Sequence, residues 1–401
     1  MAEGTHADVR DPHIEIRVAH ITTAAVSLRA LLLDQLLYLQ DRGVRVITMS
    51  ADGPEVKQLV DRGIRHFSLP LNRRLFSPIS DLRSLMRITR VLRREGIRVV
   101  HTHTPKASVL GQIAGVIARV PIRISTLHGL FEGGNMPHFQ KRLVRSLEMM
   151  GVRLADVVLS QNNEDLIYLR ERRVELRTRL MHLGNGIDLN RFDPHMIDPE
   201  MITAMKEEVG VPATAPIVGF VGRLSGERKG LWTLIRAAPI IRERFPGAVF
   251  LLVGKPDWGK SDCIDPSGVD GSLAESFRFL GYRENNDLPA LYAIMDALVL
   301  PSTFEGVPRV VMEAAAMAVP SVVSDVKGNR EVIEDGFNGF LFPYGDEHAM
   351  AKAVLAILED ESLRRKLGSN AREGAVPRFD QQSVFDQVFR CYQQALAKHR
   401  G

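Results

Sequence analysis

Cysteine is almost absent from this sequence of 401 residues, which contains only Cys263 and Cys391. Two cysteines exclude a disulfide scaffold and make a reducing compartment such as the cytosol the simplest expectation. Low-complexity tracts and short repeats are also missing, and the N-terminal residues lack the basic segment of a signal peptide. The most apolar stretch, 24–39, contains Arg29 and Asp34 and is too short to span a bilayer. We therefore expect a soluble, cytoplasmic globular protein.

The hydrophobic pattern predicts two α/β domains. Short apolar runs alternate with helical patterns, which is typical of doubly wound parallel sheets. The alternation stops at 183–216, where glycine and proline cluster, and then starts again. We predict a first Rossmann-like domain over 1–190, a second over 191–379, and a cleft between them where ligands bind at the carboxyl ends of strands. A final helix, within 380–401, follows a second break at 374–380.

The expected elements can be placed from this alternation. The expected strands are 14–20, 44–50, 99–101, 122–127 and 157–160 in the first domain and 217–221, 249–253, 297–300 and 321–323 in the second. The expected helices are 26–40, 81–94, 107–118, 139–149, 231–243, 288–295, 308–318 and 381–398. Right-handed crossovers through these helices would leave the strands parallel.

The helix predicted over 81–94 carries a basic stripe. Ser80 is placed to cap its N-terminus. Its inner face is assigned to Leu82, Leu85, Met86 and Leu92. The arginines at three- and four-residue spacing are Arg83, Arg87, Arg90 and Arg94. Residues 51–150 hold 17 Lys and Arg against 7 Asp and Glu, which suggests an anionic partner, with a solvated basic face as the alternative. Aromatic residues for base stacking are sparse there, so we expect no nucleic-acid partner.

The segment Pro301–Pro320 joins a predicted strand to a predicted helix and contains two carboxylates. Its loop holds Glu305 and Gly306, and Pro308 suits the first helical turn, where free N–H groups attract an anion. Glu305 and Glu313 would lie roughly 12 Å apart in a helix that rises ~1.5 Å per residue. That is too far to flank one glycosidic bond. Both fit better as hydrogen-bond acceptors for a long, hydroxyl-rich ligand, with a surface loop and a solvated glutamate as the simpler alternative.

A second segment, Gly219–Gly230, runs from a predicted strand through a glycine-rich loop into a helix. The loop carries Arg223, Arg228 and Lys229. Glycines let the backbone approach a phosphate, and the cationic side chains neutralise its charge. The segment predicts a phosphate site, and the alternative is an ordinary turn with solvated cations.

Three other patterns carry less weight. Residues 254–261 match the phosphate loop of nucleotide hydrolases, but no helix follows, and Pro256 and Pro266 favour an irregular loop. His101 and His103 could ligate a metal, yet the segment offers no third ligand, so we favour strand-end histidines. No Gly-x-Gly-x-x-Gly pattern follows the first strand, which argues against a nicotinamide enzyme.

Together the motifs resemble glycosyltransferase family 4 over nearly the whole chain. The residues that carry the resemblance are Gly222-Arg223, Lys229-Gly230, Glu305 with Glu313, Asn185–Asp188, and Ser324–Gly328 with Glu331. Thr102–Lys106 and Thr126–Gly129 resemble bacterial members that build polysaccharide or lipid-linked glycan precursors. The resemblance implies a GT-B fold, a retaining reaction, and no required metal or other cofactor.

The resemblance also implies roles for individual residues. Arg223 and Lys229 would hold the donor diphosphate, Glu305 the transferred sugar, Glu313 the ribose, and His128 would lie beside the anomeric centre. Loop amides after Glu305 would cap the phosphates, and Arg283 would lie near the base. The full donor set is Gly222, Arg223, Lys229, Arg283, Glu305, Gly306, Val307, Pro308, Arg309 and Glu313, with His128, Glu305, Arg223 and Lys229 as catalytic members. The acceptor set is Ser27, His103 and Lys106. It is the less specified one, because Thr22–Ser27 stand where many relatives carry glycines.

The sequence therefore predicts transfer of a hexose-type sugar from a nucleoside diphosphate, UDP by preference, to a hydroxyl of a polysaccharide or polyprenyl-linked precursor. The first domain, with helix 380–401 packed back on it, would bind the acceptor, and the second would bind the donor. The basic first domain predicts peripheral contact with the anionic inner face of a membrane. The alternatives are a nucleotide-sugar epimerase, a non-catalytic sugar-nucleotide binding protein, and a glycosyltransferase with a small soluble acceptor.

Overall fold

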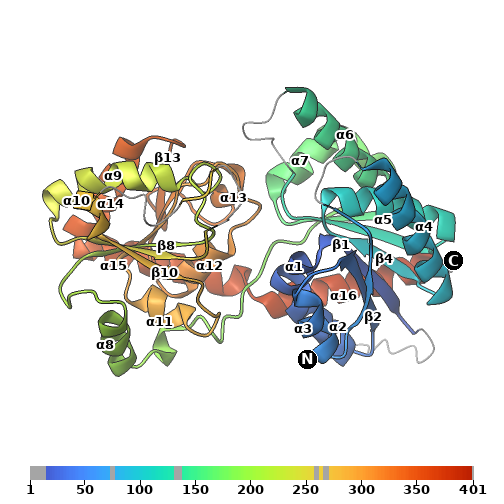
Figure 1. The fold of residues 1–401 in the computed structure, drawn as a ribbon, viewed down its shortest axis with the longest axis horizontal. Coiled ribbons are helices and arrows are strands. Elements are labelled where there is room, and N and C mark those ends of the chain that lie inside the picture. The colour runs from blue at the N-terminus through green and yellow to red at the C-terminus, as the bar shows by residue number, and fades with distance from the viewer. Residues whose placement is uncertain (1–14, 73–76, 131–137, 257–261, 265–270, 400–401) are drawn as a thin grey trace, which may run out of the picture.

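The computed structural model describes residues 15–72, 77–130, 138–256, 262–264 and 271–399 (Figure 1). They form two lobes, each built on one parallel sheet. The first sheet has seven strands in the order β3-β2-β1-β4-β5-β6-β7, and the second has six in the order β10-β9-β8-β11-β12-β13. The predicted pair of doubly wound parallel sheets is confirmed.

The first sheet and its helices come from the N-terminal half. The strands are β1 (Arg17–Ala24), β2 (Arg45–Ala51), β3 (Arg65–Ser68), β4 (Val99–Thr102), β5 (Ile122–Leu127), β6 (Val157–Ser160) and β7 (Arg179–His182). The helices are α1 (Ala25–Ser27), the π-helix η1 (Leu28–Leu32), α2 (Leu33–Asp41), α3 (Glu55–Asp61), α4 (Pro78–Arg94), α5 (Pro105–Ala118), α6 (His138–Leu154), α7 (Asn163–Glu171) and the 3-10 helix η2 (Val174–Leu176). The edge strands β3 and β7 were not predicted, because both are short, half-exposed and rich in basic residues.

The second sheet follows the linker. Its strands are β8 (Ile217–Val221), β9 (Val249–Val253), β10 (Phe277–Gly281), β11 (Ala297–Leu300), β12 (Ser321–Ser324) and β13 (Gly339–Phe342). The remaining helices are η3 (Pro194–Met196), α8 (Pro199–Glu208), α9 (Leu231–Arg244), α10 (Gly271–Ala274), α11 (Leu288–Ala293), α12 (Arg309–Ala316), α13 (Lys327–Arg330), α14 (Glu347–Glu359), α15 (Glu361–Arg378) and α16 (Gln381–Lys398). Strands β8, β9 and β11 have the predicted bounds and are buried along their whole length, as helices on both faces require.

Helix α16 belongs to the core of the first lobe although it follows the second in sequence (Figure 1). Val388 and Tyr392 lie in the same buried cluster as Val18 of β1. The chain thus passes between the lobes twice, and the two passages are hydrogen-bonded to each other. Ile187 N donates to Phe379 O at 2.8 Å. The backbone N–H of Gln381, the first residue of α16, donates to Ile187 O at 3.0 Å.

Helix α4 differs from its predicted placement. Its N-cap is Ser77 rather than Ser80. Leu82 and Met86, which were assigned to the inner face, are 57% and 51% exposed. The buried residues are Ser84, Ile88, Thr89, Val91 and Leu92. The buried face of α4, the helix that packs against α5, therefore includes Ser84 and excludes Leu82 and Met86. Among the helices of the described ranges, none has both the length and the apolar composition needed to cross a membrane.

Candidate functional site

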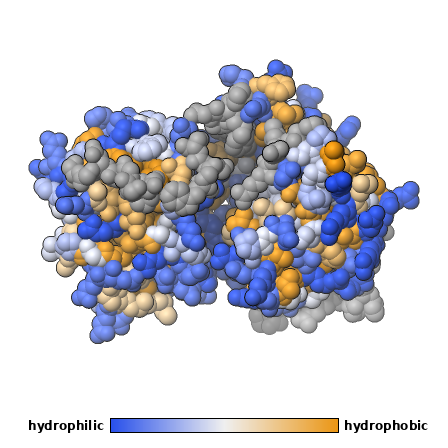
Figure 2. Space-filling model, in the orientation of Figure 1, coloured by the Kyte–Doolittle hydropathy of each residue, from blue (hydrophilic) through white to orange (hydrophobic). Residues whose placement is uncertain are grey.

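A cleft separates the two lobes (Figure 2), and loops at the carboxyl ends of strands line it. It contains a cavity of about 300 Å³. The lining residues are Leu31, His128, Gln161, Asn185, Arg228, Phe304, Glu305, Gly306, Val307, Pro308 and Arg309. His128 follows β5, Gln161 follows β6, and the residues from Phe304 to Pro308 follow β11. This is the edge at which ligands bind in parallel sheets.

The loop after β5 and the loop after β11 come into contact at Gly129 and Gly306, one glycine from each lobe. A Cβ added to Gly306 would lie 2.0 Å from the carbonyl oxygen of His128, and one added to Gly129 would lie 2.8 Å from Gly306 Cα. Asn162 Nδ2 also donates to Gly306 O at 3.3 Å, and Asn185 Nδ2 to Val307 O at 3.0 Å. These contacts place His128 of the first lobe directly against the Glu305–Gly306 loop of the second.

Lys229 and Glu305 form an ion pair at the wall of this cleft. Lys229 Nζ lies 2.6 Å from Glu305 Oε1, and the side chains are 18% and 12% exposed. Gly230, the N-cap of α9, adopts φ +70°, and a Cβ there would lie 1.8 Å from Pro301 O. This close approach brings the glycine-rich loop of β8 against the loop of β11. Lys229, which is predicted to bind the phosphates, and Glu305, which is predicted to bind the sugar, are therefore neighbours.

Glu313 lies beneath the cleft on α12, which begins at Arg309 with Pro308 as its N-cap. The Tyr292 hydroxyl donates to Glu313 Oε2 at 2.9 Å, and Arg309 Nε lies 3.8 Å from Oε1. Burial raises the pKa of this carboxyl, and Arg309 partly opposes that shift. Glu313 does not line the cavity. Its predicted contact with a ribose stays a prediction.

The other predicted donor residues are distributed unevenly. Val307, Pro308 and Arg309 line the cavity. Gly222 and the exposed Arg223 follow β8 outside that lining. Arg283 follows β10, and its guanidinium donates to Glu208 of α8 at 2.5 Å. The roles of Gly222, Arg223 and Arg283 toward a donor stay predictions.

The predicted acceptor residues do not form one group. Ser27 ends α1, one turn before the cavity residue Leu31. His103 is buried and lines a cavity of about 140 Å³ together with His128. Lys106 Nζ lies 2.7 Å from Asp81 Oδ1 of α4, an ion pair that no pattern in the sequence indicates.

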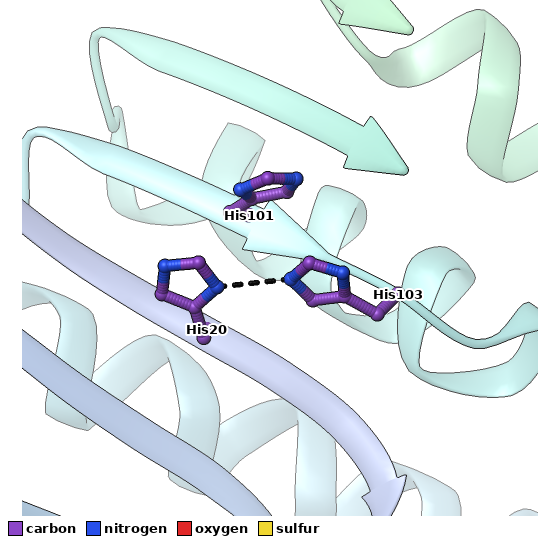
Figure 3. Close-up of side chains that lie close together, drawn as sticks. All are labelled: His20, His101 and His103. Atoms are coloured by element: carbon purple, nitrogen blue, oxygen red, sulfur yellow. Dashed lines mark hydrogen bonds between the residues drawn. The ribbon is translucent and has the colours of Figure 1, made fainter. Parts of the chain in front are cut away.

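The fold brings a third histidine to the predicted pair. His20, His101 and His103 are all buried, and their nearest ring nitrogens lie within 4.8 Å of one another (Figure 3). The third histidine lies outside the segment of His101 and His103, because His20 comes from β1, which is distant in sequence but pairs with β4. The expectation that no metal is needed stays a prediction. Of the phosphate-loop match, residues 257–261 lie outside the described residues.

Two family models match the chain. "Glycosyl transferase 4-like domain" matches residues 30–186, and "Glycosyl transferases group 1" matches residues 201–374. A phosphatidyl-myo-inositol mannosyltransferase of Mycobacterium tuberculosis is 30% identical over 74% of this chain and 73% of the relative. The chain belongs to the family 4 glycosyltransferases.

Other relatives of this glycosyltransferase match over nearly its full length. The UDP-Gal:alpha-D-GlcNAc-diphosphoundecaprenol alpha-1,3-galactosyltransferase of Escherichia coli is 27% identical over 97% of this chain and 98% of its own. The crystal structure of Anabaena HepE in complex with UDP superposes with a TM-score of 0.77 at 24% identity, covering 95% of this chain and all of that one. The enzyme therefore has the GT-B fold.

Five residues that line the cavity of the glycosyltransferase are absent from the predicted site: the apolar Leu31 and Phe304, and the polar Gln161, Asn185 and Arg228. Gln161 follows β6 as His128 follows β5, and this shared position was the available signal. Asn185 was noted only as part of a linker motif. Arg228 belongs to the predicted phosphate loop, but the predicted site contains Arg223 of that loop instead.

Proposed function

We propose that this enzyme transfers a hexose-type sugar, with retention, from a UDP-sugar to a hydroxyl of a polyprenyl-diphosphate-linked or polysaccharide precursor. The observation that carries the proposal is the Lys229–Glu305 pair in the cleft beside His128. The relatives support the finer assignment. The E. coli relative is named for UDP-galactose and a diphosphoundecaprenol-linked sugar, and the Anabaena structure contains UDP. The second lobe would bind the donor and the first lobe the acceptor.

The cleft supplies groups suited to this reaction. Negative charge grows on the departing diphosphate, and Lys229, Arg228 and Arg223 of one loop can stabilise it. Glu305 can accept hydrogen bonds from the sugar hydroxyls. The proposal requires no metal, because these side chains supply the positive charge.

The carboxylates near the cavity decide between the two possible routes to retention. A double displacement requires one carboxylate as nucleophile and a second group as acid and base. Within the described part of the chain, Glu305 is the single carboxylate among the residues that line the cavity, and it is paired with Lys229. We therefore propose a same-face route, in which the leaving phosphate takes the proton of the acceptor hydroxyl as the new bond forms.

The proposal can be tested with a panel of nucleotide sugars and acceptors, with products identified by mass spectrometry. A glycosylated polyprenyl-diphosphate sugar is expected, and its anomeric configuration by NMR reports retention or inversion. An isomerised sugar nucleotide formed without acceptor would support an epimerase instead. Binding of UDP-sugar without turnover on any acceptor would support a non-catalytic binding protein, and turnover on soluble sugars alone would exclude the lipid-linked substrate.

The two glutamates are expected to separate sugar binding from nucleotide binding. Glu305→Gln should leave the affinity for free UDP within about twofold but lower turnover at least tenfold, because its hydrogen bonds to sugar hydroxyls strengthen in the transition state. Glu313→Gln should weaken UDP and UDP-sugar alike, by the roughly tenfold that a lost charged hydrogen bond costs. Calorimetry with UDP and with UDP-sugar measures both. The reverse pattern would exchange the two roles.

We also propose that the first lobe contacts an anionic membrane through helices α4, α5 and α6. These helices pack side by side, α4 with α5 and α5 with α6. The outward-facing apolar residues on them are Ile79, Leu82, Met86, Val116, Ile117, Phe139 and Met150. Four exposed arginines of α4 form the basic stripe, Arg83, Arg87, Arg90 and Arg94, and Arg93 is exposed beside them. Apolar side chains beside basic ones suit a lipid surface, where each cation contributes about 1 kcal/mol.

Vesicle sedimentation tests this contact. The protein should bind vesicles that contain phosphatidylglycerol at low salt and dissociate as salt rises, because surface charges are screened. Reversal of the four α4 arginines to glutamate should abolish binding, and Leu82→Ser with Met86→Ser should weaken it. The control is Arg365→Glu with Lys366→Glu on α15 of the other lobe. Equal binding by the α4 variants and the control would show that this face does not contact the membrane.

A further inference from the structure

A chain of buried hydrogen bonds begins beneath the cleft. The hydroxyl of Thr126 lies 2.7 Å from Nε2 of His101. The other ring nitrogen of His101, Nδ1, lies 2.6 Å from the hydroxyl of Tyr392. His101 and Tyr392 are both fully buried, and Tyr392 comes from α16. The helix that crosses back from the second lobe is thus bonded to the centre of the first sheet.

The chain of hydrogen bonds continues from Tyr392 to the cleft. The Tyr392 hydroxyl also lies 3.3 Å from His20 Nε2, and His20 Nδ1 lies 2.9 Å from His103 Nε2, the contact drawn in Figure 3. His103 Nδ1 then lies 3.3 Å from His128 Nε2. The hydrogen-bonded chain therefore reaches the ring that lines the cavity beside Glu305, where the side chain of Gln161 is the further partner of His128.

These links constrain one another. Burial lowers the pKa of His20 to about 3 and that of His128 to about 4, and it holds the pKa values of His101 and His103 well below their usual range. All four rings are therefore neutral near pH 7, and each has one N–H donor and one acceptor nitrogen. With a ring or hydroxyl at every link, the chain has only two fully bonded arrangements. In one arrangement every group donates toward His128, and in the other every group donates away from it. The Tyr392 oxygen selects the second: its 2.6 Å contact with His101 is typical of a donating O–H, and its 3.3 Å contact with His20 is that of an acceptor from an N–H.

A metal ion explains this cluster less well. The ring nitrogens of His20, His101 and His103 are close enough to share an ion. Both nitrogens of each ring already have a hydrogen-bond partner from the protein, so ligation would break links of the chain. Metal-bound histidines usually direct only their second nitrogen to a protein partner.

We propose that Tyr392 is a positioning residue for the transfer reaction. Its hydroxyl joins the two halves of this chain of hydrogen bonds and thereby holds the His128 ring in one tautomer and one orientation at the cleft. Loss of its oxygen separates Thr126 and His101 from the remaining histidines. His20 then loses a partner, and the three rings that end at His128 are free to take either polarity. The role of His128 in the reaction rests on the proposed function, whereas its tautomer does not.

Tyr392→Phe tests the proposal because it removes one oxygen and keeps the ring. We expect kcat to fall roughly tenfold, the scale of one lost hydrogen bond, with the KM for donor and the affinity for UDP within about twofold. The 15N spectrum of histidine-labelled protein should show His128 as one tautomer in the parent and as a mixture in Tyr392→Phe. His128→Asn assigns the signal. Thr126→Val, which removes the first link, should shift the spectrum in the same direction.

The control is Val388→Ala, one turn earlier on α16 and equally buried. It should lower thermal stability and leave both the spectrum and kcat unchanged. The proposal is overturned by an unchanged 15N spectrum in Tyr392→Phe, by a kcat loss that Val388→Ala reproduces, or by stoichiometric zinc in the purified protein. A parent without transferase activity but with a Tyr392-dependent spectrum would reject the proposed function and leave the positioning chain standing.

Discussion

Lys229→Ala is expected to weaken UDP binding and turnover together, by roughly 10- to 100-fold each. A charge-assisted hydrogen bond contributes about 1.5–3 kcal/mol. The variant also leaves Glu305 without the ion pair at 2.6 Å. An unpaired carboxylate at that wall of the cleft would repel the diphosphate, so the loss should reach the upper end of this range. Calorimetry with UDP and initial rates with UDP-sugar measure the two effects.

The control for Lys229→Ala is Arg244→Ala at the C-terminal end of α9, the helix that begins two residues after Lys229. Arg244 forms an exposed ion pair with Glu359, and α9 places it ~20 Å from Lys229 at ~1.5 Å per residue. Its loss should change neither UDP affinity nor turnover, because exposed pairs contribute little. Unchanged UDP affinity in a folded Lys229→Ala protein would remove Lys229 from the donor site.

Gly306→Ala is expected to reduce turnover at least tenfold. The added Cβ would lie 2.0 Å from the carbonyl oxygen of His128. The nearest atoms all belong to the backbone, so no side chain can move aside to relieve the clash. Overpacking of this kind costs about 1–3 kcal/mol. Opening the lobes would relieve the clash only by breaking the buried pair of Lys327 and Asp165, whose atoms lie 2.8 Å apart.

The matched control is Gly247→Ala, between α9 and β9. A Cβ there meets nothing within 4 Å and the residue does not have positive φ, so the variant should retain full activity. Steady-state rates and thermal unfolding compare the two variants. Normal turnover in Gly306→Ala would show that the lobes need not meet at this contact during catalysis.

The sequence predicted the central strands well because their burial leaves a plain signal. Strands β8, β9 and β11 are continuous apolar runs, and their bounds were predicted correctly. The edge strands β3 and β7 have one open side and carry arginine and histidine, so the same criterion missed them. The inner face of α4 was predicted correctly at Leu85 and Leu92, which pack on the core, and wrongly at Leu82 and Met86, which are exposed. The buried face includes Ser84 and Ile88 instead.

The site was predictable where its residues follow a strand and unpredictable where they meet across the fold. Glu305 and Lys229 lie in loops whose composition suggests a phosphate or sugar ligand, and they do pair. The partner of His101 is Tyr392, 291 residues away. Hydrophobic periodicity cannot indicate such a pairing, because it reports which face is buried and not which residues meet.

The crossing of α16 also has a consequence for how the chain folds during synthesis. The first lobe consists of an early segment and a late one, and the donor lobe lies between them in sequence. Val388, Tyr392 and Leu396 fill the interior of the first lobe, yet they leave the ribosome after all of the second. Domains usually fold in the order in which they are made. Here the second lobe can complete its core first, and the first lobe must wait with an open groove along β1 and α2 until the last helix arrives.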